Sequence, residues 1–201
     1  MRKILKVFGI FKLLFYKING YNLQFNLNVF FHPQAKIIME RKKGNIVFGN
    51  NVCISKNVNV IVKDNGIIEF GDKLAILDNV HIEVGPNASI ILSKETFINK
   101  DCKIVSMQKI KIGENVAIGP NVMFFDHDHV VKKDTKQDWS KFKSEKILIQ
   151  DNVWIGANSI ILKKAYVGHN SIIAAGSIIN KKIAENSLCY NKRELECKKL
   201  N

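Results

Sequence analysis

The chain has 201 residues, of which 46% are hydrophobic, enough for one domain with a sizeable core. Its formal net charge of +13 favours phosphates, acidic glycans, nucleic acid or an anionic membrane as partners, although a general bias toward Lys, Asn and Ile would also produce it. No nucleic-acid-binding motif or aromatic–basic platform is present, which argues against a nucleic-acid partner. The four cysteines, Cys53, Cys102, Cys189 and Cys197, lack metal-ligand spacing, and we expect free thiols in the reducing cytoplasm.

Residues 1–18 place apolar residues at helical spacing, which predicts an amphipathic helix. Lys3, Lys6, Lys12 and Lys17 interrupt every apolar run, so we expect neither a transmembrane span nor a signal peptide. Two interpretations of the apolar face remain open. It packs on the protein body or a neighbouring subunit, or it lies peripherally on the inner face of the cell membrane.

A repeat of six residues dominates the rest of the chain, most clearly after residue 148. A period of six fits neither a helix nor a single strand, but it fits a solenoid with three short strands per coil. We therefore predict an all-β solenoid of about six coils over residues 48–180, after a lead-in within residues 1–47 whose segment Lys36–Met39 opens the solenoid. The expected interior residues are Phe48, Ile54, Val60, Phe70, Ile76, Ile82, Leu92, Ile98, Ile104, Ile112, Ile118, Phe124, Ile149, Ile155, Ile161, Val167, Ile173 and Ile179.

Three departures from the repeat carry information. Glycine follows interior residues such as Ile118 and Ile155, where we expect the coil to bend tightly. Residues 125–146 form a long insertion that contains two histidines and Trp139, and long loops on rigid scaffolds are usually functional. The basic tail, residues 181–201, is expected to leave the repeat, and its segment NKRELECKKL predicts a short closing helix.

Four stretches resemble the hexapeptide-repeat acyltransferases, and in particular the sugar O-acetyltransferase branch. They are FINKDCKI at 97–104, IGENVAIGPNVMFFDHDH at 112–129, NVWIGANSIIL at 152–162 and VGHNSIIAAGSII at 167–179. The resemblance implies a left-handed parallel β-helix, a homotrimer with active sites between neighbouring subunits, acetyl-CoA lying along the coils, and an acceptor held under the loop.

The resemblance also implies catalytic residues. It places the general base at His129, with His127 as the second candidate. Histidine suits this role because it titrates near neutral pH. Asn99 helps to shape the site, and Asp126 or Asp128 orients the imidazole or contacts the acceptor. The alternative interpretation of the DHDH stretch is a polar loop or a weak metal site.

Two tryptophans are further candidates. Trp154 is expected to face outward. There its indole N–H can stabilise the oxyanion, or its ring can stack on the cofactor. The alternative is that Trp154 packs against a neighbouring subunit. Trp139 is expected to cover the acceptor or to pack on its own subunit.

For the acetyl-CoA donor, the resemblance points to small residues along which the pantetheine arm runs and to two cations for the phosphates. These residues are Gly156, Ala157, Ala174, Ala175, Gly176 and Ser177, followed by Lys181 and Lys182. The family's closing Gly-Asn-Pro-Ala-Lys is absent, and no acid stands near Ser106–Gln108, so a galactoside-like acceptor is not expected.

These features predict an acetyl-CoA-dependent O-acetyltransferase that acts on a carbohydrate, such as a cell-surface glycan or its precursor. A xenobiotic acetyltransferase of the streptogramin or chloramphenicol type shares the chemistry, and a non-catalytic trimeric scaffold shares only the fold. A zinc hydratase resembling γ-carbonic anhydrase needs three converging histidines, and His81, His127 and His129 lack that spacing, so no metal is expected.

Overall fold

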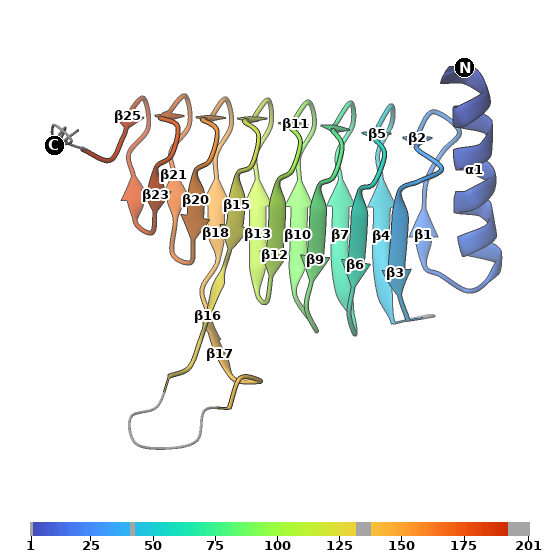
Figure 1. Cartoon of the computed structure of the whole chain (residues 1–201), viewed down its shortest axis with the longest axis horizontal. Helices are drawn as coiled ribbons and strands as arrows, with labels where there is room; N and C mark the ends of the chain where they lie inside the picture. Colours follow the sequence, from blue (N-terminus) through green and yellow to red (C-terminus); the bar gives the residue numbers. More distant parts are fainter. Residues whose placement is uncertain (1, 41–42, 132–137, 193–201) are drawn as a thin grey trace, which may run out of the picture.

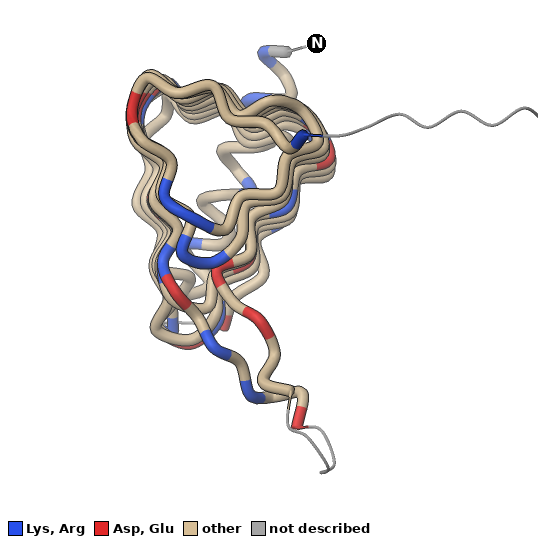
Figure 2. Tube along the Cα trace, turned by 90° about the vertical axis from the view of Figure 1, so that its left-hand side faces the viewer, with Lys and Arg blue, Asp and Glu red and all other residues tan. Residues whose placement is uncertain are grey.

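The computed structural model describes residues 2–40, 43–131 and 138–192. Three parallel β-sheets wrap around one long axis, and the helix α1 (Arg2–Ile18) lies across the N-terminal end (Figure 1). Viewed along that axis, the coils superpose into a triangle with one sheet on each side (Figure 2). The architecture is the left-handed parallel β-helix that the family resemblance implied.

Each complete turn of the solenoid contributes one strand to each sheet, in the order A, B, C. Sheet A consists of β1 (Leu23–Gln24), β4 (Gly44–Phe48), β7 (Gly66–Phe70), β10 (Ser89–Leu92), β13 (Lys109–Ile112), β18 (Ile147–Ile149), β21 (Tyr166–Val167) and β24 (Lys182–Ile183). Sheet B consists of β2 (Phe30–Phe31), β5 (Cys53–Ile54), β8 (Ala75–Ile76), β11 (Phe97–Ile98), β14 (Ala117–Ile118), β19 (Trp154–Ile155), β22 (Ile172–Ile173) and β25 (Leu188–Cys189). Sheet C consists of β3 (Lys36–Met39), β6 (Asn59–Val62), β9 (His81–Val84), β12 (Lys103–Ser106), β15 (Met123–Phe125), β20 (Ile160–Leu162) and β23 (Ile178–Ile179).

The solenoid is longer than the sequence predicted, with about seven turns instead of six. The expected lead-in supplies β1, β2 and β3, so the first turn begins at Leu23. Phe25, Phe31 and Ile37 do repeat every six residues, but two aromatic residues and a proline mask the aliphatic pattern. At the other end, β24 and β25 begin an eighth turn where we expected the tail to leave the repeat. Cys197 and nearly all of the expected closing helix lie outside the described residues.

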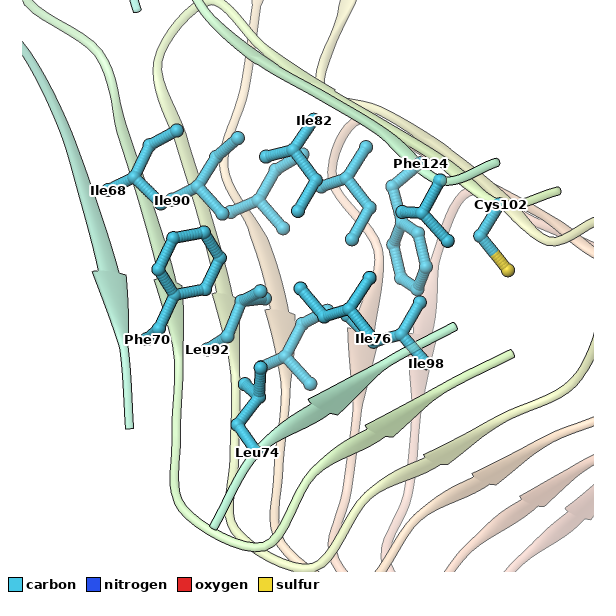
Figure 3. Close-up of a cluster of buried hydrophobic side chains, with 14 of the residues drawn as sticks. Ile68, Phe70, Leu74, Ile76, Ile82, Ile90, Leu92, Ile98, Cys102 and Phe124 are labelled. Atoms are coloured by element: carbon cyan, nitrogen blue, oxygen red, sulfur yellow. The ribbon is translucent and has the colours of Figure 1, made fainter. Parts of the chain in front are cut away.

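The interior of the coils is a continuous stack of aliphatic and aromatic side chains (Figure 3). Every interior residue expected from the six-residue repeat is at most 4% exposed. The rings of Phe48 and Phe70 stack with their centroids 5.0 Å apart. Burying each such side chain stabilises the fold by roughly 1.5–3 kcal/mol. Cys102 lies in the same core, where burial raises the pKa of its thiol to about 11.

Asparagine has a structural role at the corners, which a compositional bias does not explain. In the described ranges, fifteen non-glycine residues have positive φ, and eleven of them are asparagines, the residue other than glycine that best tolerates this conformation. Their side chains stack from coil to coil, with Asn115 Nδ2 donating to Asn152 Oδ1 at 2.9 Å and Asn152 Nδ2 donating to Asn170 Oδ1 at 3.2 Å. These ladders hold adjacent coils in register.

The corner glycines are required by the neighbouring coil and not, as predicted, by a tight bend. A Cβ on Gly119 would lie 2.7 Å from the backbone nitrogen of Ala157, and a Cβ on Gly156 would lie 2.5 Å from that of Ala175. Neither glycine has a positive φ. The absence of a side chain therefore allows successive coils to stack closely.

Helix α1 covers the open end of the first turn. Leu13 is fully buried, and a Cβ on Gly9 would collide with the carbonyl of Phe31. Lys12 Nζ donates to the carbonyl oxygens of Pro33 at 2.8 Å and Ala35 at 2.7 Å. Burial, with the nearby charge of Lys36, lowers the pKa of Lys12. One stripe of the helix thus packs on the protein body. Within the described ranges, no helical segment combines the length and the apolarity that a bilayer span needs.

Candidate active site

The insertion leaves the solenoid between β15 and β18 and begins as a short antiparallel hairpin (Figure 1). Its strands are β16 (His127–His129) and β17 (Phe142–Ser144), with His127 opposite Ser144 and His129 opposite Phe142. The hairpin projects from the corner between sheets C and A (Figure 2). We call this corner, with the hairpin, the histidine corner.

Asp126 anchors the root of the hairpin. Its side chain is fully buried, and its carboxylate accepts hydrogen bonds from Ser106 Oγ at 2.7 Å and from the backbone N–H groups of Met107, Gln108 and Lys109 at 2.7–2.9 Å. Burial alone would raise the pKa of Asp126, but the hydrogen bonds from His127 and from residues 106–108 outweigh it and hold the pKa below its usual range. The carboxylate is therefore ionised at neutral pH.

His127 is the histidine that this carboxylate orients. Its Nδ1 lies 3.3 Å from Asp126 Oδ1. The ring lies between Phe125 and Phe142, with centroids 6.3 Å and 5.8 Å away in edge-on arrangements, and only 13% of the side chain is exposed. Because an ionised carboxylate accepts a hydrogen bond from Nδ1–H, Nε2 is left with the lone pair that a general base needs.

His129 lies farther out on the hairpin and has a different environment. It is exposed, and its ring meets that of Trp139 edge-on at 5.8 Å. Asp128 does not orient either histidine but pairs with Lys163 Nζ at 2.7 Å, which ties the hairpin to the next coil. Trp139 is itself 63% exposed and therefore available to a ligand.

Four lysines surround the histidine corner on the following coils. Lys163 and Lys164 lie between β20 and β21, and Lys181 lies between β23 and β24. Lys164 pairs with Glu145 at 3.5 Å, and Lys182 Nζ lies 5.4 Å from the centroid of the Tyr166 ring. The two lysines expected to bind the cofactor phosphates, Lys181 and Lys182, are thus at or beside this corner.

The small residues expected along the pantetheine arm gather at the next corner, between sheets B and C. Gly156 and Ala157 follow β19, and Ala174, Ala175 and Gly176 follow β22. Gly176 has φ 68°, and its N–H donates to the Ala157 carbonyl at 2.7 Å. We call this corner the glycine corner. Small residues thus occupy this corner on two consecutive coils, and Ala175 among them is exposed.

Three other predicted residues belong to the same side of the solenoid. Asn99 follows β11 at the corner between sheets B and C, and Trp154 projects outward from β19 with 56% of its surface exposed. Ser177, in contrast, is buried, and its hydroxyl donates to the Ala174 carbonyl at 2.6 Å. Ser177 therefore supports the glycine corner from inside the coil instead of facing a cofactor.

The candidate site is divided within one chain. The width of sheet C separates the histidine corner from the glycine corner (Figure 1). Asn99 and Trp154 therefore do not meet His127 or His129 in a single copy. A site that unites these residues requires a second copy of the chain.

Sequence reasoning missed the partners that build the root of the hairpin. Ser106 and the turn at 107–109 lie one coil before Asp126, and their role was not visible because no acid stands among them. The acid at that turn is Asp126, which belongs to the insertion and reaches the turn from the next coil. Lys163 was missed for a similar reason, since it meets Asp128 only through coil stacking. The described residues include no group of three or more His, Cys, Asp or Glu side chains that could hold a metal ion.

Comparison with protein families supports the predicted resemblance. Residues 146–181 match the model of the family described as bacterial transferase hexapeptide (six repeats). Over 105 residues the chain is 31% identical to the galactoside O-acetyltransferase of Lactococcus lactis, covering 52% of this chain and 50% of that protein. Over 99 residues it is 34% identical to the galactoside O-acetyltransferase of Escherichia coli K12, covering 49% and 48%. The chain thus spans about half the length of these relatives, and the resemblance to hexapeptide-repeat acetyltransferases is confirmed.

Among solved structures, the chain resembles a point mutant of AntD, an N-acyltransferase from Bacillus cereus, in complex with dTDP and coenzyme A. The TM-score is 0.54 at 15% sequence identity, over 92% of this chain and 89% of that one. At this identity the likeness concerns the fold alone.

Proposed function

Since residues 146–181 carry the hexapeptide repeats of the bacterial transferase family, we propose that this protein is an acetyl-CoA-dependent O-acetyltransferase. The observation that carries the proposal is the contact between Asp126 and His127 on a hairpin that projects from the solenoid. A buried carboxylate that orients a largely buried imidazole is the arrangement that a general base requires. The two galactoside O-acetyltransferases to which the chain is similar support acetyl transfer to a sugar hydroxyl.

The proposed reaction moves one acetyl group and one proton. Nε2 of His127 removes the proton of the acceptor hydroxyl as its oxygen attacks the thioester carbonyl. The carbonyl oxygen becomes an oxyanion, and the exposed Trp154 has an indole N–H suited to stabilise it. When the C–S bond breaks, the imidazolium returns the proton to the thiolate, which leaves as free CoA. Asp126 stabilises the imidazolium between these steps.

His127 replaces His129 as the proposed base. The alignment of motifs favours His129, but no carboxylate of the described residues orients it, and Asp128 is committed to Lys163. We assign to His129 and Trp139 the outer wall of the acceptor site, because both are exposed and in contact with each other.

The acceptor is proposed to be a carbohydrate hydroxyl, such as that of a cell-surface glycan or its precursor, and not a simple galactoside. The turn at 106–108, where some sugar acetyltransferases place an acid for the acceptor, has no acid of its own. The carboxylate of Asp126 already occupies this turn with all its hydrogen bonds directed to the protein.

The base is tested by three alanine variants and a thiol assay of acetyl transfer to a panel of sugars. We expect His127→Ala to lower kcat by about 10²–10⁴-fold and His129→Ala to act mainly on KM for the acceptor. His169→Ala, whose side chain pairs with Glu185 on another corner, is the matched control and should behave like wild type. Loss of kcat in His129→Ala with full activity in His127→Ala would transfer the role of base to His129.

The donor is tested by thermal shift with acetyl-CoA, CoA and ATP. A ligand that binds only the folded state raises the apparent melting temperature. Stabilisation by both CoA species but not by ATP supports the proposal. An equal response to ATP, or no response at all, would leave a non-catalytic scaffold as the better interpretation.

The division of the site between two corners leads us to propose a homotrimer whose clefts pair the histidine corner of one copy with the glycine corner of the next. Mixing two inactive variants tests this arrangement. His127→Ala removes the base, and Ala175→Glu places a negative charge on the exposed surface of the glycine corner. Mixed trimers should recover roughly a quarter of the wild-type sites, because half of the copies carry each intact corner. If both corners of one chain formed the site, mixing would restore nothing.

A further inference from the structure

Helix α1 presents an apolar face that no described part of the chain covers. Six large side chains on this face are between 53% and 84% exposed: Ile4, Val7, Phe8, Phe11, Phe15 and Ile18. At about 100° per residue these six positions fall on one continuous side of the helix, opposite Gly9 and Leu13, which pack on the first turn. A contiguous apolar surface of this kind marks an interaction site, since proteins rarely leave one exposed.

The position of α1 shows which surfaces could reach this face. The helix lies across the end of the solenoid, so its apolar face points away from the coils, along the solenoid axis (Figure 1). Copies that pack side by side through their sheets would leave the end open. The face is therefore suited to a flat surface that meets the end of the solenoid.

The charges around the face are all positive. Residues 1–39 contain neither aspartate nor glutamate, and they include Lys3, Lys6, Lys12, Lys17 and Lys36. On the helix, Lys3 lies next to one edge of the apolar face, and Lys17 lies farther round on the same side. Lys12, beyond the other edge, donates to the carbonyls of Pro33 and Ala35. A second copy of the face placed against the first would bring these lysines together without any acid between them. An anionic surface would complement them.

Beside the helix, Lys3 and Lys6 line a groove of about 520 Å³ formed with Asn28, Phe30 and Cys53 of the first two turns. Two ammonium groups next to a hollow of this size can receive the phosphate of a lipid headgroup while the apolar face enters the acyl boundary.

From these observations we propose that α1 docks the protein on an anionic lipid surface, with the solenoid standing on its N-terminal end. The apolar face enters the interface, and Lys3 and Lys6 contact the headgroups. The binding is peripheral, since the helix is too short and too interrupted by lysines to span the bilayer. This proposal is independent of the acetyl-transfer chemistry.

The test is flotation of the full-length protein with vesicles of phosphatidylcholine, alone or mixed with phosphatidylglycerol. We expect binding to the mixed vesicles, weaker binding to phosphatidylcholine alone, and weakening by added salt. The double variant Phe8→Asp/Phe11→Asp should partition at least about tenfold less. Lys3→Glu/Lys6→Glu should lose the preference for phosphatidylglycerol.

A matched control separates lipid binding from general surface effects. Leu188→Asp changes an equally exposed leucine at the other end of the solenoid and should float like wild type. Circular dichroism and elution volume establish that each variant is folded and keeps its assembly. Flotation of Phe8→Asp/Phe11→Asp at the wild-type level, or absence of wild-type binding to either vesicle, overturns the proposal. A reduced oligomeric mass in this double variant would instead make the face a contact between copies.

Discussion

Oδ1 of Asp126 lies 3.3 Å from Nδ1 of His127, while Oδ2 of the same carboxylate accepts hydrogen bonds from the coil before it. One buried side chain thus joins the proposed base to the solenoid. The orientation of His127 and the attachment of the hairpin should therefore fail together when this carboxylate is removed.

Asp126→Asn should lower the free energy of unfolding by about 1–3 kcal/mol at neutral pH. An amide keeps one acceptor oxygen and replaces the other with an NH₂ donor. Either the N–H of Met107, which donates to Oδ1, or those of Gln108 and Lys109, which donate to Oδ2, then lack an acceptor. Urea unfolding measures the loss. Asp138→Asn, in an exposed part of the same insertion, is the control and should have little effect.

The effect of Asp126→Asn should also depend on pH. Because the pKa of Asp126 is lower in the folded state than in the unfolded chain, its stabilising contribution is complete above the unfolded pKa of about 3.9. It is lost as the pH falls through the lower folded pKa. The difference in unfolding free energy between wild type and variant should therefore shrink below about pH 4. A difference that stays constant down to the acid limit would show that the carboxylate is not the stabilising form.

Asn152 tests the asparagine ladder. Asn152→Gly removes its hydrogen bonds with Asn115 and Asn170 but keeps the positive φ accessible. Asn152→Ala removes the same bonds and adds left-handed strain of about 1–2 kcal/mol. Thermal unfolding should therefore rank wild type above Asn152→Gly and Asn152→Gly above Asn152→Ala. Equal stability of the two variants would mean that the backbone relaxes without strain.

Gly156→Ala should destabilise the solenoid by about 1–3 kcal/mol, because the added methyl group meets the backbone nitrogen of Ala175, which cannot move without separating two coils. Gly85→Ala is the matched control. The nearest atom to its new methyl group is Met107 Sδ, the end of a flexible side chain. Denaturant unfolding of both variants should show a much smaller loss for Gly85→Ala, and a similar loss in both would argue against coil stacking as the cause.

Lys12→Met should lower stability by about 1–3 kcal/mol, because the carbonyls of Pro33 and Ala35 lose a charged donor at the open end of the first turn. Lys3→Met, an exposed position on the same helix, should change stability little. Melting curves followed by circular dichroism compare the two. If they were equally stable, the helix would be held by Leu13 and Gly9 alone.

The fold was largely predictable because one buried side chain recurs at every sixth position along most of the solenoid. Each of the predicted interior positions from Phe48 to Ile179 holds an aliphatic or phenylalanine side chain. Their regular spacing is visible in the sequence alone, without knowledge of which residues they contact in the folded chain. The two ends of the solenoid were not predictable because this spacing is masked or irregular there. Pro33 and the aromatic residues Phe25 and Phe31 mask the first turn. At the other end, the step from Ile179 in the seventh turn to Ile183 in the eighth is four positions instead of six.

The site was predictable in its residues but not in its arrangement. Motif resemblance singled out His127, Trp154 and the small residues near Ala174, but a motif does not state at which corner of a solenoid it lies. Corner positions follow from counting strands, and the contact between Asp126 and the turn after Ser106 depends on coil stacking across the insertion. The choice between His127 and His129 therefore required side-chain geometry.

The number of turns between α1 and the hairpin acts as a spacer of defined length. Helix α1 lies on the first turn, and the hairpin leaves between the fifth and the sixth. With coils about 4.8 Å apart, the histidines stand roughly 20–25 Å above the first turn, and about 30 Å above the outer surface of a helix some 10 Å thick. On a lipid surface, hydroxyls at headgroup level would be beyond the reach of His127. The acceptor would then be a freely diffusing sugar or the distal residues of a long, lipid-linked chain.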